Sequence, residues 1–146
     1  MEKARVLLDT NILISGLVFT KGNEHKILRL IEERHITLVL PETVLMEARK
    51  VLMEKFPGFE RLWDLFLGRI ELETVPLSHI LSTLKTSTAK VRDSKDAPIY
   101  VAIALAKPDY VVTGDKILRL DLRRSLEIIG NTKVCSSKEF LDEFKK

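Results

Sequence analysis

Acidic side chains follow apolar segments at two widely separated points of the chain, and their chemistry suits a metal ion. Asp9 follows the apolar residues 6–8, and Asp115 follows a second apolar segment that ends at Thr113. Asp93 and Asp96 belong to a third acidic segment, which precedes an apolar helix-like stretch. Carboxylates that converge repel one another, and burial raises the cost of their charge, so a hard divalent cation is the usual partner.

Such a cluster of carboxylates suits the hydrolysis of a phosphodiester bond. Mg²⁺ and Mn²⁺ prefer oxygen ligands, and a water bound to such an ion becomes a nucleophile while the ion neutralises charge on a phosphoryl group. The sequence contains no glycine-rich phosphate loop and no HExxH, paired CxxC or GxSxG motif. Nucleotide kinases, zinc enzymes and serine hydrolases therefore lose support.

Each of these acids also has a purely structural interpretation. Asp9 and Asp96 each precede a helix-like segment and can cap it, which is commoner than catalysis for an isolated Asp. Asp115 beside Gly114 suits a turn, and Asp93 resembles an ordinary loop acid. From the residues alone, both interpretations stay open.

Glu47 lies at the margin of an apolar helix face rather than in the middle of a polar one. Val44 precedes it by three residues and Val51 follows it by four, so the three side chains share one side of a helix. Long polar side chains often lie along such margins, so an exposed surface Glu is the alternative.

Strand-like and helix-like segments alternate along the chain, which predicts a mainly parallel sheet in one three-layer α/β/α domain over residues 1–146. Residues 97–107 are apolar on almost every side, which predicts a centrally buried helix. Asn23 is expected to cap the helix that follows it. The strands are expected near residues 6–8, 36–40, 70–75, 110–113, 127–129 and 133–135. The helices are expected at residues 12–17, 24–34, 41–55, 59–67, 76–88, 97–107 and 137–145.

The composition is that of a cytoplasmic globular protein. A net charge of +3 and a pI near 9.0 are compatible with nucleic acid without identifying it as a partner. Cys135 is the single cysteine and is expected to be a small buried residue in a reducing compartment. No apolar run approaches the roughly 18 residues of a membrane span. The high share of Lys and Glu is seen in thermophile proteins.

Lysines and arginines flank the acidic segments and could hold a phosphate backbone, although most such side chains are simply solvated. These residues are Lys85, Lys90, Arg92, Lys95, Lys116, Arg119, Arg123 and Arg124.

Several segments, in this order, resemble those of the PIN-domain ribonucleases. They are Asp9-Thr10-Asn11, Glu47 in a helix that starts at Pro41-Glu42, Arg92-Asp93-Ser94-Lys95-Asp96, and Val112-Thr113-Gly114-Asp115. Val134 then leads into Ser136-x-x-Glu139-Phe140-Leu141, which is similar to the closing strand and helix of that family. The resemblance covers essentially the whole chain, and the closest likeness is to the toxin components of bacterial and archaeal toxin–antitoxin pairs.

The resemblance implies a parallel sheet of about five strands with helices on both sides. It also implies Mg²⁺- or Mn²⁺-dependent cleavage of single-stranded RNA, a homodimer, and a small antitoxin protein as a possible partner. By position, the acidic quartet that binds the metal and catalyses the reaction corresponds to Asp9, Glu47, Asp96 and Asp115.

Three further residues correspond to polar positions around that quartet. Asn11 and Thr113 resemble the residues that orient it, and Asp93 resembles a neighbouring acid. Many members of the family place another acid directly after the third site, whereas this chain has Ala97.

Two other functions are compatible with the same residues. A PIN-like module without catalysis could bind RNA or a protein partner. Another Mg²⁺-dependent phosphoryl-transfer domain, such as a receiver or a phosphatase, could also place an Asp after its first strand. A phosphatase of that kind needs a second Asp two residues later, where this chain has Asn11.

Overall fold

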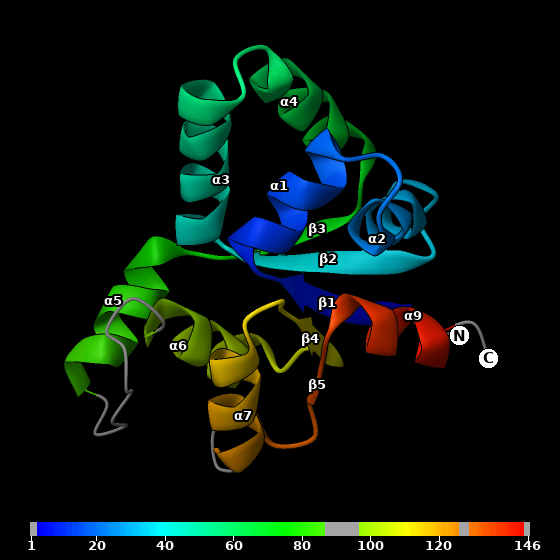
Figure 1. The fold of residues 1–146 in the computed structure, drawn as a ribbon. Helices are drawn as coiled ribbons and strands as arrows, with labels where there is room; N and C mark the ends of the chain where they lie inside the picture. Colours follow the sequence, from blue (N-terminus) through cyan, green and yellow to red (C-terminus); the bar gives the residue numbers. More distant parts are fainter. Residues whose placement is uncertain (1–2, 87–96, 126–128, 145–146) are drawn as a thin grey trace.

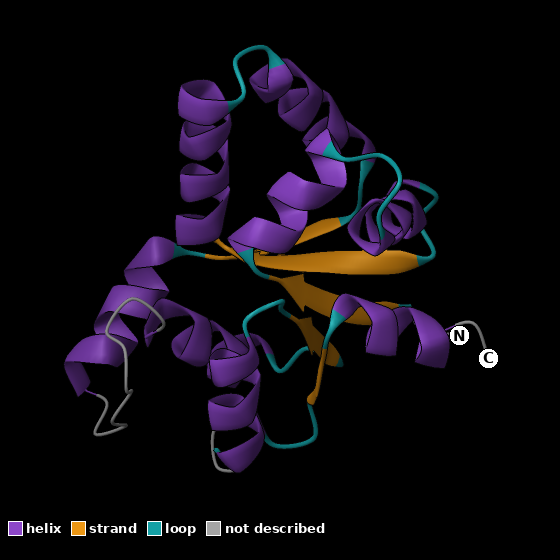
Figure 2. Ribbon diagram, in the orientation of Figure 1, coloured by secondary structure: helices purple, strands orange, loops and turns teal. Residues whose placement is uncertain are grey.

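A parallel sheet of five strands forms the centre of the molecule, as the alternation of segments predicts. The computed structural model describes residues 3–86, 97–125 and 129–144. Its strands lie in the order β3-β2-β1-β4-β5, and every neighbouring pair is parallel (Figure 2). They are β1 (Ala4–Leu8), β2 (Ile36–Pro41), β3 (Leu72–Val75), β4 (Tyr110–Val112) and β5 (Lys133–Cys135).

The middle strands are buried on both faces, which explains why their sequences are continuous apolar runs. In β1, Leu7 pairs with Val39 of β2 and with Val111 of β4, and all three side chains face one side of the sheet. Their neighbours Leu8 and Val112 face the other side. Two separate cores therefore lie against the sheet, one on each face.

Five helices pack on the face that carries Leu8. Figure 1 shows them gathered mostly above the sheet, with α9 beside its end. They are α1 (Thr10–Val18), α2 (Asn23–Glu32), α3 (Glu42–Lys55), α4 (Phe59–Arg69) and α9 (Ser137–Phe144). Gly16 allows α1 and α2 to approach closely, because a Cβ atom there would lie 2.7 Å from Leu28.

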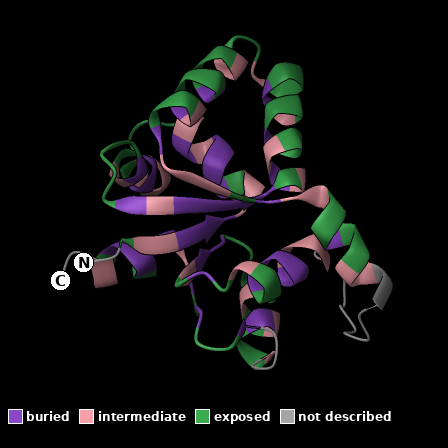
Figure 3. Cartoon of the chain, turned by 180° about the vertical axis from the view of Figure 1, so that it is seen from behind, coloured by how far each residue is buried: buried purple, intermediate pink, exposed green. Residues whose placement is uncertain are grey.

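The opposite face, which carries Leu7, is covered by α5 (Leu77–Thr86), α6 (Ala97–Ala106) and α7 (Lys116–Arg124). The inner faces of these helices are buried while their outer faces are exposed (Figure 3). Together the layers form the α/β/α arrangement that the sequence predicts. In the ranges that are described, no helix is both long enough and apolar enough to span a membrane.

Three details differ from the sequence-based expectations. The helix α2 includes Asn23 as its first residue, and the N-cap position belongs to Gly22, so α2 has no side-chain cap hydrogen bond. The apolar helix α6 is buried on one side only, and Leu105 is 45% exposed because α6 lies in an outer layer. The strand expected at residues 127–129 falls mostly outside the described residues, and Ile129 itself is not in a strand.

Candidate active site at the carboxyl ends of the strands

Asp9 occupies the junction between the central strand β1 and the helix α1. Its Oδ1 atom accepts a hydrogen bond of 2.9 Å from the backbone N–H of Ile12, so the side chain caps α1. Its Oδ2 atom accepts a hydrogen bond from the hydroxyl group of Thr113. The backbone N–H of Asp9 donates to the carbonyl of Val112 at 3.3 Å, which fixes the end of β1 against the end of β4.

Thr113 joins the two acidic strand ends. It is fully buried just after β4, and its backbone N–H donates to the carbonyl of Cys135 at 3.0 Å. Its hydroxyl donates to Asp9 and accepts a hydrogen bond of 3.1 Å from the backbone N–H of Asp115. One side chain therefore holds the loops after β1 and β4 together.

Asp115 is exposed and caps α7 in the way that Asp9 caps α1. Its Oδ1 atom accepts hydrogen bonds from the backbone N–H groups of Ile117 at 2.9 Å and Leu118 at 3.1 Å. The capping interpretation of Asp9 is thus correct, and Asp115, for which the sequence suggested a turn, is an N-cap as well. For Asp115, capping engages one carboxylate oxygen and leaves the other without a hydrogen bond among the described residues.

The charge of Asp9 is unfavourable in this position. Burial raises the pKa of its carboxyl group above the ordinary value, and the negative charge of Asp115 acts in the same direction. Hydrogen bonds from the Thr113 hydroxyl and from the backbone N–H groups of Ile12 and Gly114 oppose the rise without cancelling it. A cation near Asp9 would relieve both the burial penalty and the repulsion.

Glu47 reaches the same edge of the sheet from α3. Its side chain is exposed, and its Oε2 atom accepts a hydrogen bond of 3.2 Å from the hydroxyl of Thr10. Thr10 directly follows Asp9, so this contact links Glu47 to the loop after β1. Thr10 belongs to the Asp9-Thr10-Asn11 motif, but the sequence analysis gives it no role. Its position next to Asp9 is the only sequence signal for one.

Asn11 lies close to this edge of the sheet in the sequence, whereas the remaining two predicted acids are not described by the structure. Asn11 lies exposed in the first turn of α1, one residue after Thr10. Asp93 and Asp96 lie outside the described residues. The structure thus brings together Asp9, Thr113 and Asp115, and it connects Glu47 to them through Thr10.

The donor atoms at this edge fit a hard divalent cation. Asp9, Asp115 and Glu47 supply carboxylate oxygens, which Mg²⁺ and Mn²⁺ prefer. The pKa of Asp9 is raised chiefly by burial, and the negative charge of Asp115 adds to the rise. Within residues 3–86, 97–125 and 129–144, no three acidic, histidine or cysteine side chains lie close enough together to hold a metal ion by themselves.

Comparison with known proteins identifies the family. The sequence profile of the PIN domain matches residues 5–117, which is most of the chain. The chain belongs to the PIN domain family. An uncharacterized protein of Methanocaldococcus jannaschii is a similar relative of this PIN protein, with 30% identity over 99% of this chain and 94% of its own length.

A solved structure whose sequence is only distantly similar to this chain has a similar fold. It is the crystal structure of VapBC2 from Rickettsia felis bound to a DNA fragment from their promoter. The TM-score is 0.58 at 18% identity, and the match covers 90% of this chain and 98% of that chain. At this identity the similarity establishes the fold alone.

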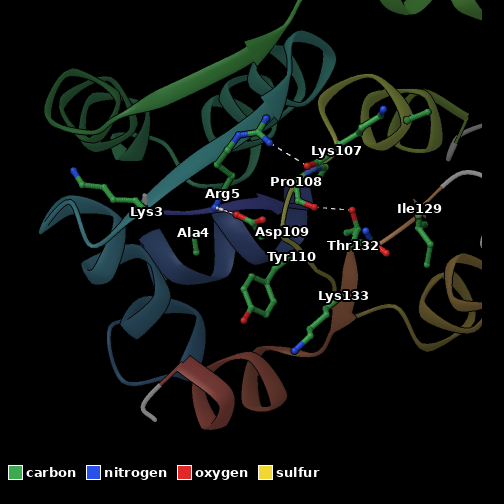
Figure 4. Close-up of a pocket in the computed structure, with 13 residues that line it drawn as sticks. Lys3, Ala4, Arg5, Lys107, Pro108, Asp109, Tyr110, Ile129, Thr132 and Lys133 are labelled. Atoms are coloured by element: carbon green, nitrogen blue, oxygen red, sulfur yellow. Dashed lines mark hydrogen bonds between the residues drawn. The ribbon is translucent and has the colours of Figure 1, made fainter. Parts of the chain in front are cut away.

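The opposite edge of the PIN sheet holds a hollow of about 990 Å³, lined partly by Lys3, Arg5 and Lys133. Figure 4 shows Arg5 directed toward the carbonyl of Lys107. The Arg5 guanidinium also donates to both carboxylate oxygens of Glu73, at 2.7 and 2.8 Å. The guanidinium of Arg5 therefore holds β1, β3 and the end of α6 together. The hollow lies at the opposite end of β1 from Asp9.

Proposed function

We propose that this PIN domain is a Mg²⁺- or Mn²⁺-dependent endoribonuclease that hydrolyses phosphodiester bonds of single-stranded RNA. The observation that carries the proposal is the position of Asp9, a half-buried carboxylate repelled by Asp115 at the carboxyl ends of adjacent parallel strands. In open α/β sheets, ligands bind in the crevice outside these strand ends.

The metal ligands in this proposal are Asp9, Glu47, Asp96 and Asp115. A bound Mg²⁺ or Mn²⁺ would supply an activated water and would neutralise negative charge on the phosphate. Asn11, Thr113 and Asp93 would orient the acids.

The surrounding hydrogen bonds prepare two of these carboxylates for a cation. The Thr113 hydroxyl and the Ile12 N–H each hold one oxygen of Asp9, which fixes the plane of the carboxylate. The N–H groups at the start of α7 fix Asp115 through one oxygen. Side chains that are held in place before the ligand arrives lose little conformational freedom on binding, which favours affinity.

The biological role that fits this activity is that of a toxin in a toxin–antitoxin pair. The family resemblance of the motifs supports this role, and the fold similarity to a chain from a VapBC2 complex is compatible with it. In this role the protein would be a cytoplasmic homodimer built from a single PIN domain over residues 1–146. A small antitoxin protein would be its partner.

Cleavage of an end-labelled, mixed-sequence single-stranded RNA tests the proposal. The reactions contain Mn²⁺, Mg²⁺ or a chelator, and the products are analysed for a 5′-phosphate and a 3′-hydroxyl. We expect cutting with either ion and none with the chelator. RNA binding without cleavage under any of these conditions would instead favour the non-catalytic PIN module.

A further inference from the structure

Arg119 lies beside the acidic edge because of the direction that helical side chains take. It follows Asp115 by one helical turn, and its backbone N–H donates to the Asp115 carbonyl at 3.0 Å. Long side chains in a helix point back toward the N-terminus. Accordingly, the Nη1 atom of Arg119 returns to the end of β4 and donates to the carbonyl of Thr113 at 2.6 Å.

This contact fixes a positive charge close to the candidate catalytic acids. The same residue, Thr113, accepts from Arg119 through its carbonyl and donates to Asp9 through its hydroxyl. Arg119 is half-buried, so its guanidinium is held against the strand end rather than extended into solvent. Its place is thus set by the same strand end that orients Asp9.

Unlike Arg5, Arg49 and Arg123, Arg119 has no carboxylate partner among the described residues. Arg5 pairs with Glu73 at 2.7 Å, and Arg49 pairs with Asp64 at 3.1 Å. On α7 itself, Arg123 donates to the carbonyl of Val134 at 2.7 Å and pairs with Glu139 at 3.3 Å. Arg119 makes the equivalent carbonyl contact, and within the part of the chain that the structure describes no carboxylate engages its other N–H groups.

We propose that Arg119 binds a phosphate of the RNA strand next to the bond that is cut. The inference rests on the proposed nuclease function and adds a substrate-binding residue to it. A planar guanidinium can donate two parallel hydrogen bonds to phosphate oxygens, and one N–H held by a backbone carbonyl fixes its orientation.

The electrostatics of the edge explain why a cation is needed there. Asp9 and Asp115 repel the phosphates of an approaching RNA strand, whereas a fixed positive charge beside them attracts the strand and sets its register. The exposed Lys116 adds positive charge at the start of the same helix. Arg119 is the one of the two whose side chain a backbone contact holds at the strand end.

RNA affinity provides a test that does not depend on cleavage. A fluorescently labelled single-stranded RNA is titrated with protein in chelator, at several salt concentrations, and its anisotropy is measured. We compare Arg119→Gln with Arg123→Gln, because both remove one charge and one carbonyl contact from α7. Circular dichroism and thermal unfolding check that both variants are folded.

Arg119→Gln is expected to weaken binding about tenfold, which is the effect of losing one charged hydrogen-bonded contact. The slope of log affinity against log salt should decrease by about 0.7, the value for one phosphate contact on a single strand. Arg123→Gln should stay within about twofold of the wild type, because its charge is already paired with Glu139. Arg119→Lys keeps the charge and should bind with intermediate affinity.

Equal affinity and equal salt slope for Arg119→Gln and Arg123→Gln would overturn the proposal, as would a wild type that binds no RNA. Failure of the nuclease proposal has a different signature. A wild type that binds RNA with the Arg119-dependent slope but never cleaves it would leave Arg119 as a phosphate-binding residue of a non-catalytic module. If Arg119→Gln fails to fold, Arg119→Lys is compared with Arg123→Gln instead. Weaker RNA binding by Arg119→Lys would support the proposal, and equal binding would overturn it.

Discussion

The hydroxyl of Thr113 donates a hydrogen bond to Oδ2 of Asp9, although 104 residues separate them in the sequence. Because the Thr113 hydroxyl also accepts from the backbone N–H of Asp115, a single buried oxygen connects both acids that follow strands β1 and β4. This relationship explains how one edge of the sheet can keep two carboxylates in fixed positions despite their repulsion.

Thr113→Val should lower cleavage activity strongly while changing the shape of the site little. The substitution removes the donor that opposes the raised pKa of Asp9, so that pKa should rise further. We expect kcat/KM to fall about 10- to 100-fold, as for other residues that orient metal ligands, and the acidic limb of the pH–rate profile to move to higher pH. Thr113→Ser keeps the hydroxyl and should retain both the activity and the profile.

Asp9→Asn should stabilise the metal-free protein at neutral pH. Burial raises the folded-state pKa of Asp9 above its ordinary value of about 3.8, so the charged carboxylate disfavours the folded state. Below about pH 3.8 the carboxyl group is protonated in both the folded and the unfolded state, so it does not reduce the free energy of unfolding. As the pH rises from there through the folded-state pKa, the wild type loses stability. Asn is also a good N-cap for α1.

Thermal unfolding in chelator, from acidic to neutral pH, measures this effect. The melting temperature of Asp9→Asn should exceed that of the wild type at neutral pH, and the difference should disappear toward low pH. A variant that is less stable than the wild type at neutral pH would show that Asp9 is not destabilised by its burial.

Arg5→Met should destabilise the fold without impairing cleavage by the folded protein. It would leave Glu73 and the carbonyls of Ala106 and Lys107 without their donor. We expect a loss of about 2–4 kcal/mol in the free energy of unfolding, measured by urea denaturation. Arg61→Met, at an exposed position of α4, is the control and should change stability little. Loss of cleavage in folded Arg5→Met would mean that the hollow at the opposite edge takes part in the reaction.

Gly16→Ala and Gly68→Ala should have opposite effects on stability. A Cβ atom at residue 16 would lie 2.7 Å from Leu28 and 2.8 Å from the carbonyl oxygen of Glu24, so α1 and α2 must separate. That overpacking should cost about 1–3 kcal/mol. A Cβ atom at residue 68 meets nothing within 4 Å, so Gly68→Ala should stabilise α4 by about 0.5–1 kcal/mol. Equal effects of the two changes on the melting temperature would contradict the close packing of α1 and α2.

Local sequence patterns predict the layers of this fold well. The apolar run at residues 6–8 indicates a strand that is covered on both faces, because only there are all of its side chains buried. Leu7 and Leu8 do face opposite cores. Ser136 and Glu139 have the spacing of a capping box, and the structure forms it with hydrogen bonds of 2.8 and 3.2 Å. Periodicity does not reveal which layer a helix joins, so the exposure of Leu105 on α6 could not be predicted.

The candidate site is only partly readable from the sequence. The pattern places Asp9 and Asp115 at strand ends, but besides metal binding it offers capping for Asp9 and a turn for Asp115. The structure shows that both acids cap helices and that, among the described residues, one oxygen of Asp115 accepts no hydrogen bond. Contacts between distant residues, such as Thr113 with Asp9 and Arg5 with Glu73, depend on strand order and have no local signal. For the same reason, nothing in the sequence separates Arg119 from the other cations of α7.

The rate of RNA cleavage by Asp9→Asn tests whether the acidic edge of the sheet is the active site. Wild type and variant are purified identically, and each cuts an end-labelled single-stranded RNA in Mn²⁺ with enzyme in excess, so that the first cleavage event is measured. We expect metal-dependent cutting by the wild type and none above the chelator control by a folded variant that still binds the RNA. Cutting by Asp9→Asn at the wild-type rate would contradict the assignment of this acidic edge as the active site.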